Sequence, residues 1–136
     1  MIVVAFEIEK NGANSNFKDV NSSDWAYEYV SAAVNKGIIS GVSADNFGYG
    51  RGVTREDMAV ILFRLAKSNG LEVDEILDID PFADHDNISD YAREGVYVMR
   101  KTGVINGFAD GTFSPKATLT RAEAAKVICE LLKIKF

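Results

Sequence analysis

The chain repeats itself, and this internal repetition constrains its fold more than any other feature of the sequence. When the sequence is aligned with itself at an offset of 66 residues, six positions that carry glycine, threonine, arginine or an aromatic ring coincide. Two further pairs, Phe17 with Phe82 and Asp19 with Asp84, align at an offset of 65. The six coincident pairs are Trp25 and Tyr91, Gly37 and Gly103, Gly41 and Gly107, Phe47 and Phe113, Thr54 and Thr120, and Arg55 and Arg121. The chain must therefore contain two similar units.

Two helices are predicted in each unit. In the first helix, apolar side chains recur at positions i, i+4, i+7 and i+8, and Gly37 or Gly103 follows where a helix end favours a positive φ. In the second helix, apolar side chains recur at i, i+3, i+4 and i+7, a stripe that faces a core. The expected helices cover residues 24–36, 55–68, 90–102 and 121–134. The predicted fold class is all-α, with tandem two-helix repeats joined by loops.

The repeats divide the chain into segments. Residues 17–69 and 82–136 are the two full units. Residues 70–81 are predicted to form an acidic connector, because no lysine or arginine occurs between residues 72 and 86. Residues 1–16 align with the end of a second helix, so we interpret them as the remnant of a leading repeat that contributes a short helix. Because that repeat is incomplete in this sequence, self-association could complete it.

Charge and hydropathy limit the partners of the chain. The net charge of −5 and the pI near 4.9 argue against nucleic acid and anionic lipid, because both partners favour a basic surface. The apolar runs fall short of the roughly 20 residues that cross a bilayer, so no membrane insertion is expected. Cys129 is the only cysteine and falls in the region of an apolar stripe, so we interpret it as a buried thiol.

The sequence offers no catalytic constellation. The single histidine, His85, lies in an acidic stretch, no metal-ligand spacing occurs, and the carboxylates are distributed as helix caps and on solvated faces. A calcium module is an alternative, but an EF-hand loop that starts at Asp78 would place Phe82 and Ala83 where an acid and the obligatory glycine belong. The aspartates that suggest it are Asp78, Asp80, Asp84, Asp86 and Asp90. We therefore expect no enzyme activity, no cofactor and no metal site.

Several short motifs resemble those of the surface-layer-homology (S-layer homology) family, and the likeness covers nearly the whole chain. In the first repeat they are Phe17-Lys18-Asp19-Val20, Gly37-Ile38-Ile39-Ser40-Gly41 and Thr54-Arg55-Glu56. In the second repeat they are Phe82-Ala83-Asp84, Gly103-Val104-Ile105-Asn106-Gly107, Asp110-Gly111-Thr112-Phe113-Ser114-Pro115 and Thr120-Arg121-Ala122-Glu123. The resemblance implies three repeats in a pseudo-threefold helical spindle. It also implies an extracellular anchoring module that binds secondary cell-wall polysaccharide, often pyruvylated, in grooves between repeats.

Two departures from the family pattern concern the expected ligand site. The first full unit has Thr-Arg-Glu-Asp where the family commonly shows Thr-Arg-Ala-Glu, and Tyr91 replaces a tryptophan in the second. The alternative function is a surface-layer lattice or protein-interaction module that does not bind sugar.

The arginines Arg55 and Arg121 are the leading candidates for ligand contacts. Thr120 and Glu123 form the pattern of a capping box, which explains both residues without a ligand. An arginine in the first turn of a helix opposes the helix dipole and should be compensated. The compensating group is either a structural carboxylate, such as Glu56 or Asp110, or an anionic ligand that the guanidinium and free helix-start amides hold together.

The remaining candidate site residues are aromatic rings and loop positions. Trp25 and Tyr91 lie at helix starts, where their rings could stack on sugars. Gly41 and Gly107 would let the backbone approach sugar hydroxyls, although a plain turn requirement explains them equally well. Asp110 completes the set, in the loop before the second arginine.

Overall fold

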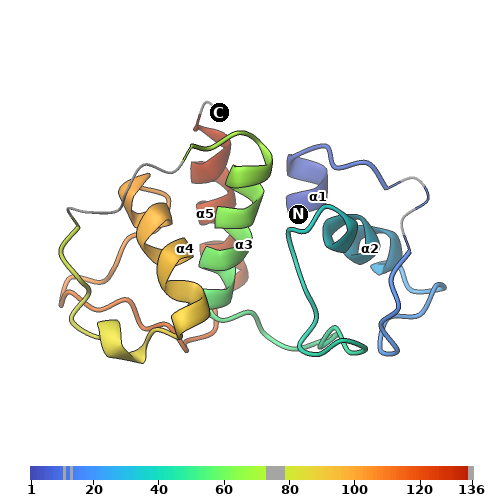
Figure 1. The fold of residues 1–136 in the computed structure, drawn as a ribbon, viewed down its shortest axis with the longest axis horizontal. Helices are drawn as coiled ribbons and strands as arrows, with labels where there is room; N and C mark the ends of the chain where they lie inside the picture. The colour runs from blue at the N-terminus through green and yellow to red at the C-terminus, as the bar shows by residue number, and fades with distance from the viewer. Residues whose placement is uncertain (11, 13, 73–78, 135–136) are drawn as a thin grey trace. The chain divides into compact units, whose positions relative to one another are not determined.

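The computed structural model describes residues 1–10, 12, 14–72 and 79–134, and within them the protein is all-α (Figure 1). Its helices are α1 (Ile2–Ala5), α2 (Tyr27–Asn35), α3 (Arg55–Ser68), the 3₁₀ turn η1 (His85–Asn87), α4 (Asp90–Lys101) and α5 (Arg121–Leu132). Apart from two isolated β-bridges, these described residues form no strand. The predicted fold class is confirmed, whereas the pseudo-threefold spindle stays a prediction. None of the described helices has the length and apolar character that crossing a membrane needs.

The chain folds into two compact units, an N-terminal unit (Met1–Arg51) and a C-terminal unit (Gly52–Phe136). Their border differs from that of the sequence repeats. The C-terminal unit combines α3, the second helix of the first repeat, with both helices of the second repeat, because α3 makes most of its helix contacts with α4. A repeat in the sequence is therefore not the same as a compact unit in the structure.

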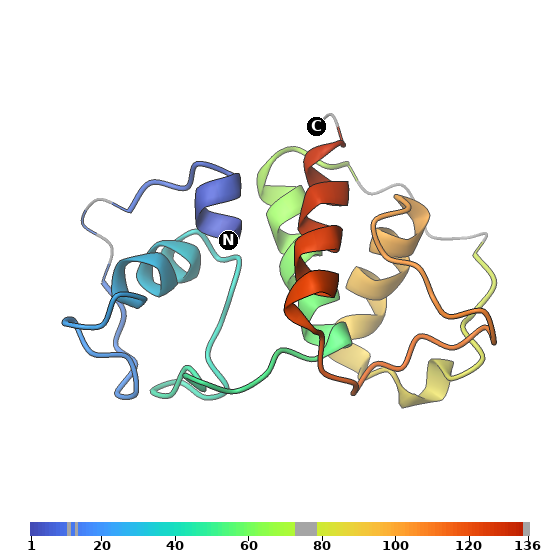
Figure 2. The same cartoon turned by 180° about the vertical axis from the view of Figure 1, so that it is seen from behind.

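The C-terminal unit is a three-helix cluster in which α3 and α5 run side by side in the same direction (Figures 1 and 2). Leu62, Leu65 and Leu131 are fully buried in its core. The α3–α4 contact depends on Gly95, because a Cβ atom there would lie 3.3 Å from the Val60 Cα atom. The small residue thus lets the two helices approach closely.

The helix ends follow the sequence closely. The Thr120 hydroxyl accepts a hydrogen bond from the Glu123 amide, and the Glu123 carboxylate accepts one from the Thr120 amide, so the predicted capping box is present. Gly37 and Gly103 adopt positive φ values of 73° and 77° just after α2 and α4. Helix α2 begins at Tyr27 rather than residue 24, because the preceding residues form turns.

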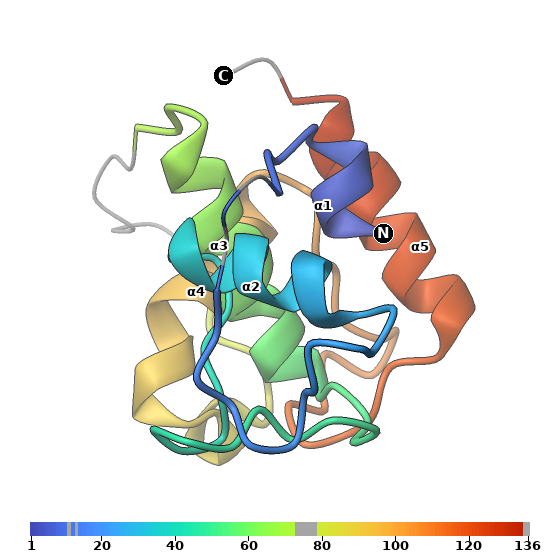
Figure 3. The ribbon, with the colours of Figure 1, turned by 90° about the vertical axis from the view of Figure 1, so that its right-hand side faces the viewer.

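The N-terminal unit packs the four-residue helix α1 against α2 (Figure 3). Val3 is buried against Ala32 and Ala33, so the first residues do contribute the expected short helix. A second cluster of buried residues forms around Val20 and Val30, with partly buried side chains packed against it, Phe47 among them.

In each sequence repeat, an aspartate holds the loop between the two helices of that repeat. The Asp19 carboxylate accepts hydrogen bonds from the amides of Phe47 (2.7 Å), Gly48 (2.8 Å) and Tyr49 (2.8 Å). Burial raises the pKa of Asp19, but these amides outweigh it and hold the pKa below its usual value. In the second repeat, Asp84 accepts hydrogen bonds from two consecutive amides in the same way. The repeated Phe-x-Asp motif is thus a loop anchor.

Two other expectations can be compared with the structure. Cys129 is exposed, so its interpretation as a buried thiol was wrong. Helix α5 turns Ile128 and Leu131 inward, and Cys129 lies one position further round the helix. Part of the acidic connector, residues 73–78, lies outside the described residues.

Candidate functional site

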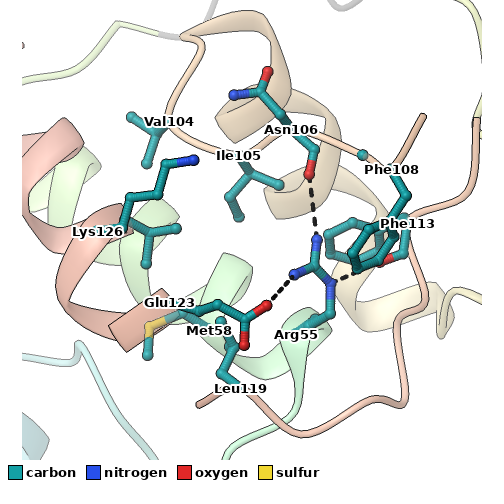
Figure 4. Close-up of a pocket in the computed structure, with 12 residues that line it drawn as sticks. Arg55, Met58, Val104, Ile105, Asn106, Phe108, Phe113, Leu119, Glu123 and Lys126 are labelled. Atoms are coloured by element: carbon teal, nitrogen blue, oxygen red, sulfur yellow. Dashed lines mark hydrogen bonds and ion pairs between the residues drawn. The ribbon is translucent and has the colours of Figure 1, made fainter. Parts of the chain in front are cut away.

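Arg55, the first residue of α3, lies in a pocket of the C-terminal unit (Figure 4). Its Nε atom donates a hydrogen bond to the Phe113 carbonyl oxygen at 2.7 Å, and its Nη2 atom donates one to the Asn106 carbonyl oxygen at 3.2 Å. The guanidinium also lies over two rings, 4.6 Å from the centroid of Phe108 and 5.1 Å from that of Phe113. Only 13% of the Arg55 side chain is exposed. The arginine therefore fastens α3 to the loop that follows α4.

The pocket has a volume of about 250 Å³ and two kinds of wall. Buried or half-buried apolar side chains form the floor, and backbone, aromatic and charged groups form the rim. The apolar set is Met58, Val104, Ile105, Phe113, Leu119 and Val127, and the others are Arg55, Asn106, Gly107, Phe108, Glu123 and Lys126. An apolar hollow with a few polar groups around it is the usual form of a small-molecule site.

The charges of Arg55 and Glu123 partly compensate each other. Their nearest atoms, Nη1 and Oε1, are 3.7 Å apart. Burial lowers the pKa of Arg55, and attraction to Glu123 and Asp84 opposes this effect. Hydrogen bonds from the Thr120 amide and hydroxyl lower the pKa of Glu123, so this carboxylate is ionised at neutral pH. Within the described residues, Glu56 is bonded to Ser89, Tyr91 and Lys116 and Asp110 to Thr112, so neither is the structural partner that was expected for Arg55 or Arg121.

The amides at the start of α3 are also occupied. The Arg55 amide donates to the Ala117 carbonyl oxygen (2.9 Å), the Glu56 amide donates to the Pro115 carbonyl oxygen (3.0 Å), and the Asp57 amide donates to the Thr54 hydroxyl (3.2 Å). No free first-turn amide is left at this helix to grip an anion together with Arg55. That part of the ligand hypothesis is wrong for α3.

Arg121 occupies the corresponding position on α5 but has different surroundings. It is exposed and does not line the pocket. Among the residues that the structure describes, its side chain has no bonded partner. The groups that hold Arg55, the carbonyl oxygens of Phe113 and Asn106, come from the loop after α4.

The candidate glycines have a structural role. A Cβ atom on Gly107 would lie 2.6 Å from the Phe82 ring and 2.7 Å from the Thr112 carbonyl oxygen. A Cβ atom on Gly41 would lie 2.4 Å from the equivalent ring of Phe17. Both glycines therefore make room for the phenylalanine of the Phe-x-Asp motif. Only Gly107 also lines the pocket.

Asp110 shapes its own loop and does not line the pocket. Its carboxylate accepts hydrogen bonds from the amide (3.0 Å) and the hydroxyl (2.7 Å) of Thr112. These two bonds lower the pKa of Asp110. The Asp-Gly-Thr-Phe motif is thereby explained as a turn that presents Phe113 to the core.

The two candidate aromatic rings differ in their contacts. Trp25, in the N-terminal unit, is 79% exposed, and its ring centroid lies 6.3 Å from that of Tyr29. Tyr91 is also exposed, but its hydroxyl shares its one proton between the carboxylates of Asp57 (2.7 Å) and Glu56 (3.2 Å) at the start of α3. Burial and these two carboxylates raise the pKa of Tyr91. Tyr91 therefore links α4 to α3, whereas Trp25 presents a free aromatic face.

Sequence reasoning missed the environment of Glu56. Only 4% of this side chain is exposed, and its carboxylate accepts hydrogen bonds from the Ser89 amide (3.0 Å), the Ser89 hydroxyl (3.1 Å) and the Lys116 ammonium (2.5 Å). Burial raises the pKa of Glu56, but these partners lower it below its usual value. The only signal in the sequence was a glutamate where the second repeat has Ala122. Sequence reasoning also did not identify Lys126, Asn106 and Phe108 as pocket residues.

Comparison with known proteins identifies related sequences. The model of the S-layer homology domain matches residues 16–59 and 81–125. The exoglucanase XynX of Acetivibrio thermocellus is 35% identical over 98% of the chain, and the surface-layer 125 kDa protein of Lysinibacillus sphaericus is 33% identical over 95%. The cellulosome-anchoring protein of A. thermocellus is 24% identical over 88% of the chain. The chain spans only 12%, 11% and 27% of the lengths of these three relatives.

Proposed function

This chain belongs to the S-layer homology family, and we propose that it is a non-catalytic module that anchors a protein to the cell surface by binding a polysaccharide of the cell wall. The matching relatives include an exoglucanase, an amylopullulanase and surface-layer proteins. The segment they share with this chain is a small part of each, which supports a role that is independent of the catalytic parts.

The Arg55 pocket is the observation that carries this proposal. It joins an apolar floor to a positively charged, aromatic rim, and sugars with an acidic substituent have the matching combination of apolar ring faces and negative charge. Its volume of about 250 Å³ lies just below the range of roughly 300–1,000 Å³ that is typical of small-molecule sites. A single sugar unit that carries a carboxylate, such as a pyruvyl ketal, suits this pocket.

Other candidate residues have supporting roles in this proposal. The exposed ring of Trp25 stacks on a sugar of the polymer, and the free guanidinium of Arg121 provides a second contact for its negative charge. Gly41, Gly107 and Asp110 shape the loops, and Tyr91 connects two helices.

The second candidate function is a protein-contact module without sugar binding. The exposed face of α5 favours it, because Ala122, Cys129 and Leu132 present small and apolar side chains to solvent there, beside Lys126. A copy of the same chain would be one such partner, through self-association. In that case the protein would form oligomers and would not bind isolated wall polymer.

Cosedimentation with purified cell-wall sacculi tests the proposed function. We expect binding to native sacculi and loss of binding once the wall polysaccharide has been extracted. Removal of pyruvyl groups should weaken binding if the acidic substituent is a ketal. Trp25→Phe, which keeps an aromatic ring, should bind better than Trp25→Ala, and Tyr49→Ala serves as a control at another exposed ring. Equal binding to native and extracted walls would contradict the proposal.

A further inference from the structure

The Arg55 pocket contains three charged side chains, and two of them are already bonded within the protein. Arg55 donates to two carbonyl oxygens and lies 3.7 Å from Glu123. Glu123 is held by the amide and hydroxyl of Thr120 at 2.9 Å and 2.8 Å. Because their charges are opposite and close, this pair presents little net charge to a ligand.

Lys126 is the third charge of the pocket, and its situation is different. It is exposed and lines the pocket from α5. Its ammonium extends toward Ile105 (Figure 4). Within the part of the chain that the structure describes, no carboxylate or carbonyl group binds it. The uncompensated positive charge of the pocket is therefore that of Lys126.

The internal repeat indicates that this lysine is not required by the fold. The equivalent residue in the first repeat, 66 positions earlier, is Val60. Val60 is 8% exposed and lies at the close contact between α3 and Gly95 of α4. The same helix position thus takes an apolar residue where it packs and a lysine where it borders the pocket.

We propose that Lys126 binds the negatively charged group of the ligand and makes this pocket prefer an acidic wall polymer over a neutral one. Arg55 then acts as a positioning residue, which holds the loop of Asn106, Phe108 and Phe113 so that the apolar floor and the rim keep their shape. The inference rests on the proposed function of the pocket. It differs from the sequence-based hypothesis in assigning the selectivity for charge to Lys126 rather than to Arg55 or Arg121.

The test compares Lys126→Gln with wild type on two probes: purified wall polysaccharide, and the same polymer after its carboxylates have been reduced to alcohols. We expect the variant to lose about tenfold in affinity for the native polymer, the scale of one charge-assisted hydrogen bond at a partly exposed site. Its affinity for the reduced polymer should not change. Lys133→Gln removes the same charge at the C-cap of α5, outside the pocket, and serves as the control.

Two further measurements separate the roles of the two cations. Binding of wild type to the native polymer should weaken with added salt, and Lys126→Gln should reduce that dependence. Arg55→Lys should weaken binding to both polymers by a similar factor and lower the thermal midpoint, since lysine cannot reproduce the planar fork. Lys126→Arg keeps the charge and should retain the preference for the acidic polymer.

The outcomes distinguish this inference from the proposed function. If wild type binds the native polymer and Lys126→Gln binds it equally well, the role of Lys126 is overturned and the anchoring function stands. Equal losses on both polymers would also overturn it, because they would indicate a general effect on the pocket. If wild type binds neither polymer, the proposed function fails, and the inference fails with it.

Discussion

The substitution Glu56→Ala places at position 56 the residue that the second repeat has at the equivalent position, Ala122. It tests whether the contacts of Glu56 stabilise the C-terminal unit. The change removes the acceptor of the Ser89 amide at the start of α4, where the Ser89 side chain makes no cap of its own. Loss of a helix cap costs about 1 kcal/mol. Loss of the bond with Lys116, whose side chain is 59% exposed, adds roughly 0.5–1 kcal/mol after allowance for solvent screening.

The bond from the Tyr91 hydroxyl adds little, because Tyr91 keeps Asp57 as a partner. The free energy of unfolding should therefore fall by about 2 kcal/mol, and the thermal midpoint by roughly 8–16 °C for a unit of this size. Urea denaturation followed by far-UV circular dichroism measures the loss. Glu94→Ala removes an exposed carboxylate from α4 and should change stability by less than about 0.5 kcal/mol. Equal stabilities of the two variants would refute the reasoning.

Three other predictions follow from the same contacts. The difference in unfolding free energy between wild type and Glu56→Gln should be constant above about pH 5 and should decrease at lower pH. The reason is that a carboxylate with a lowered pKa loses its stabilising effect as it is protonated. Urea titrations at a series of pH values measure this difference. Gly107→Ala should destabilise the C-terminal unit by about 1–3 kcal/mol through its clash with Phe82, in a thermal melt, and an unchanged midpoint would contradict the packing argument. Asp84→Ala should speed hydrogen exchange at the amides of Phe113 and Ser114, which lose their acceptor. Hydrogen exchange at the amides in the centre of α3 should stay slow.

Local patterns in the sequence predicted much of the fold. The apolar periodicity identified α2, α3, α4 and α5, and the capping box and the two glycines identified where helices start and end. These features depend on residues within a few positions of one another, so a single chain reveals them. The boundary between compact units was not predictable in this way, because it depends on which helix packs against which.

The candidate site was predicted only in part, for the same reason. The repeat made Arg55 and Arg121 equivalent, but the groups that surround Arg55 come from residues 106–113, more than 50 positions away in the sequence. No local pattern distinguishes an arginine that is held by such a loop from one that is free. Glu56 was missed because its partners Ser89 and Lys116 belong to the other repeat.

The exposure of Cys129 illustrates a limit of helical periodicity. A stripe of apolar residues predicts which face of a helix is buried, but a small residue at the edge of the stripe can lie on either side. Ile128 and Leu131 define the buried face of α5, and Cys129 lies beyond its edge.

Binding to cell-wall sacculi with and without their polysaccharide tests the central claim most directly. The account predicts that the protein cosediments with native sacculi, that extraction of the polysaccharide abolishes binding, and that purified polysaccharide competes in solution. Peptidoglycan that has been stripped of polysaccharide should not retain the protein. Undiminished binding to stripped peptidoglycan, or no competition by the purified polymer, would contradict the assignment of a polysaccharide-binding anchor.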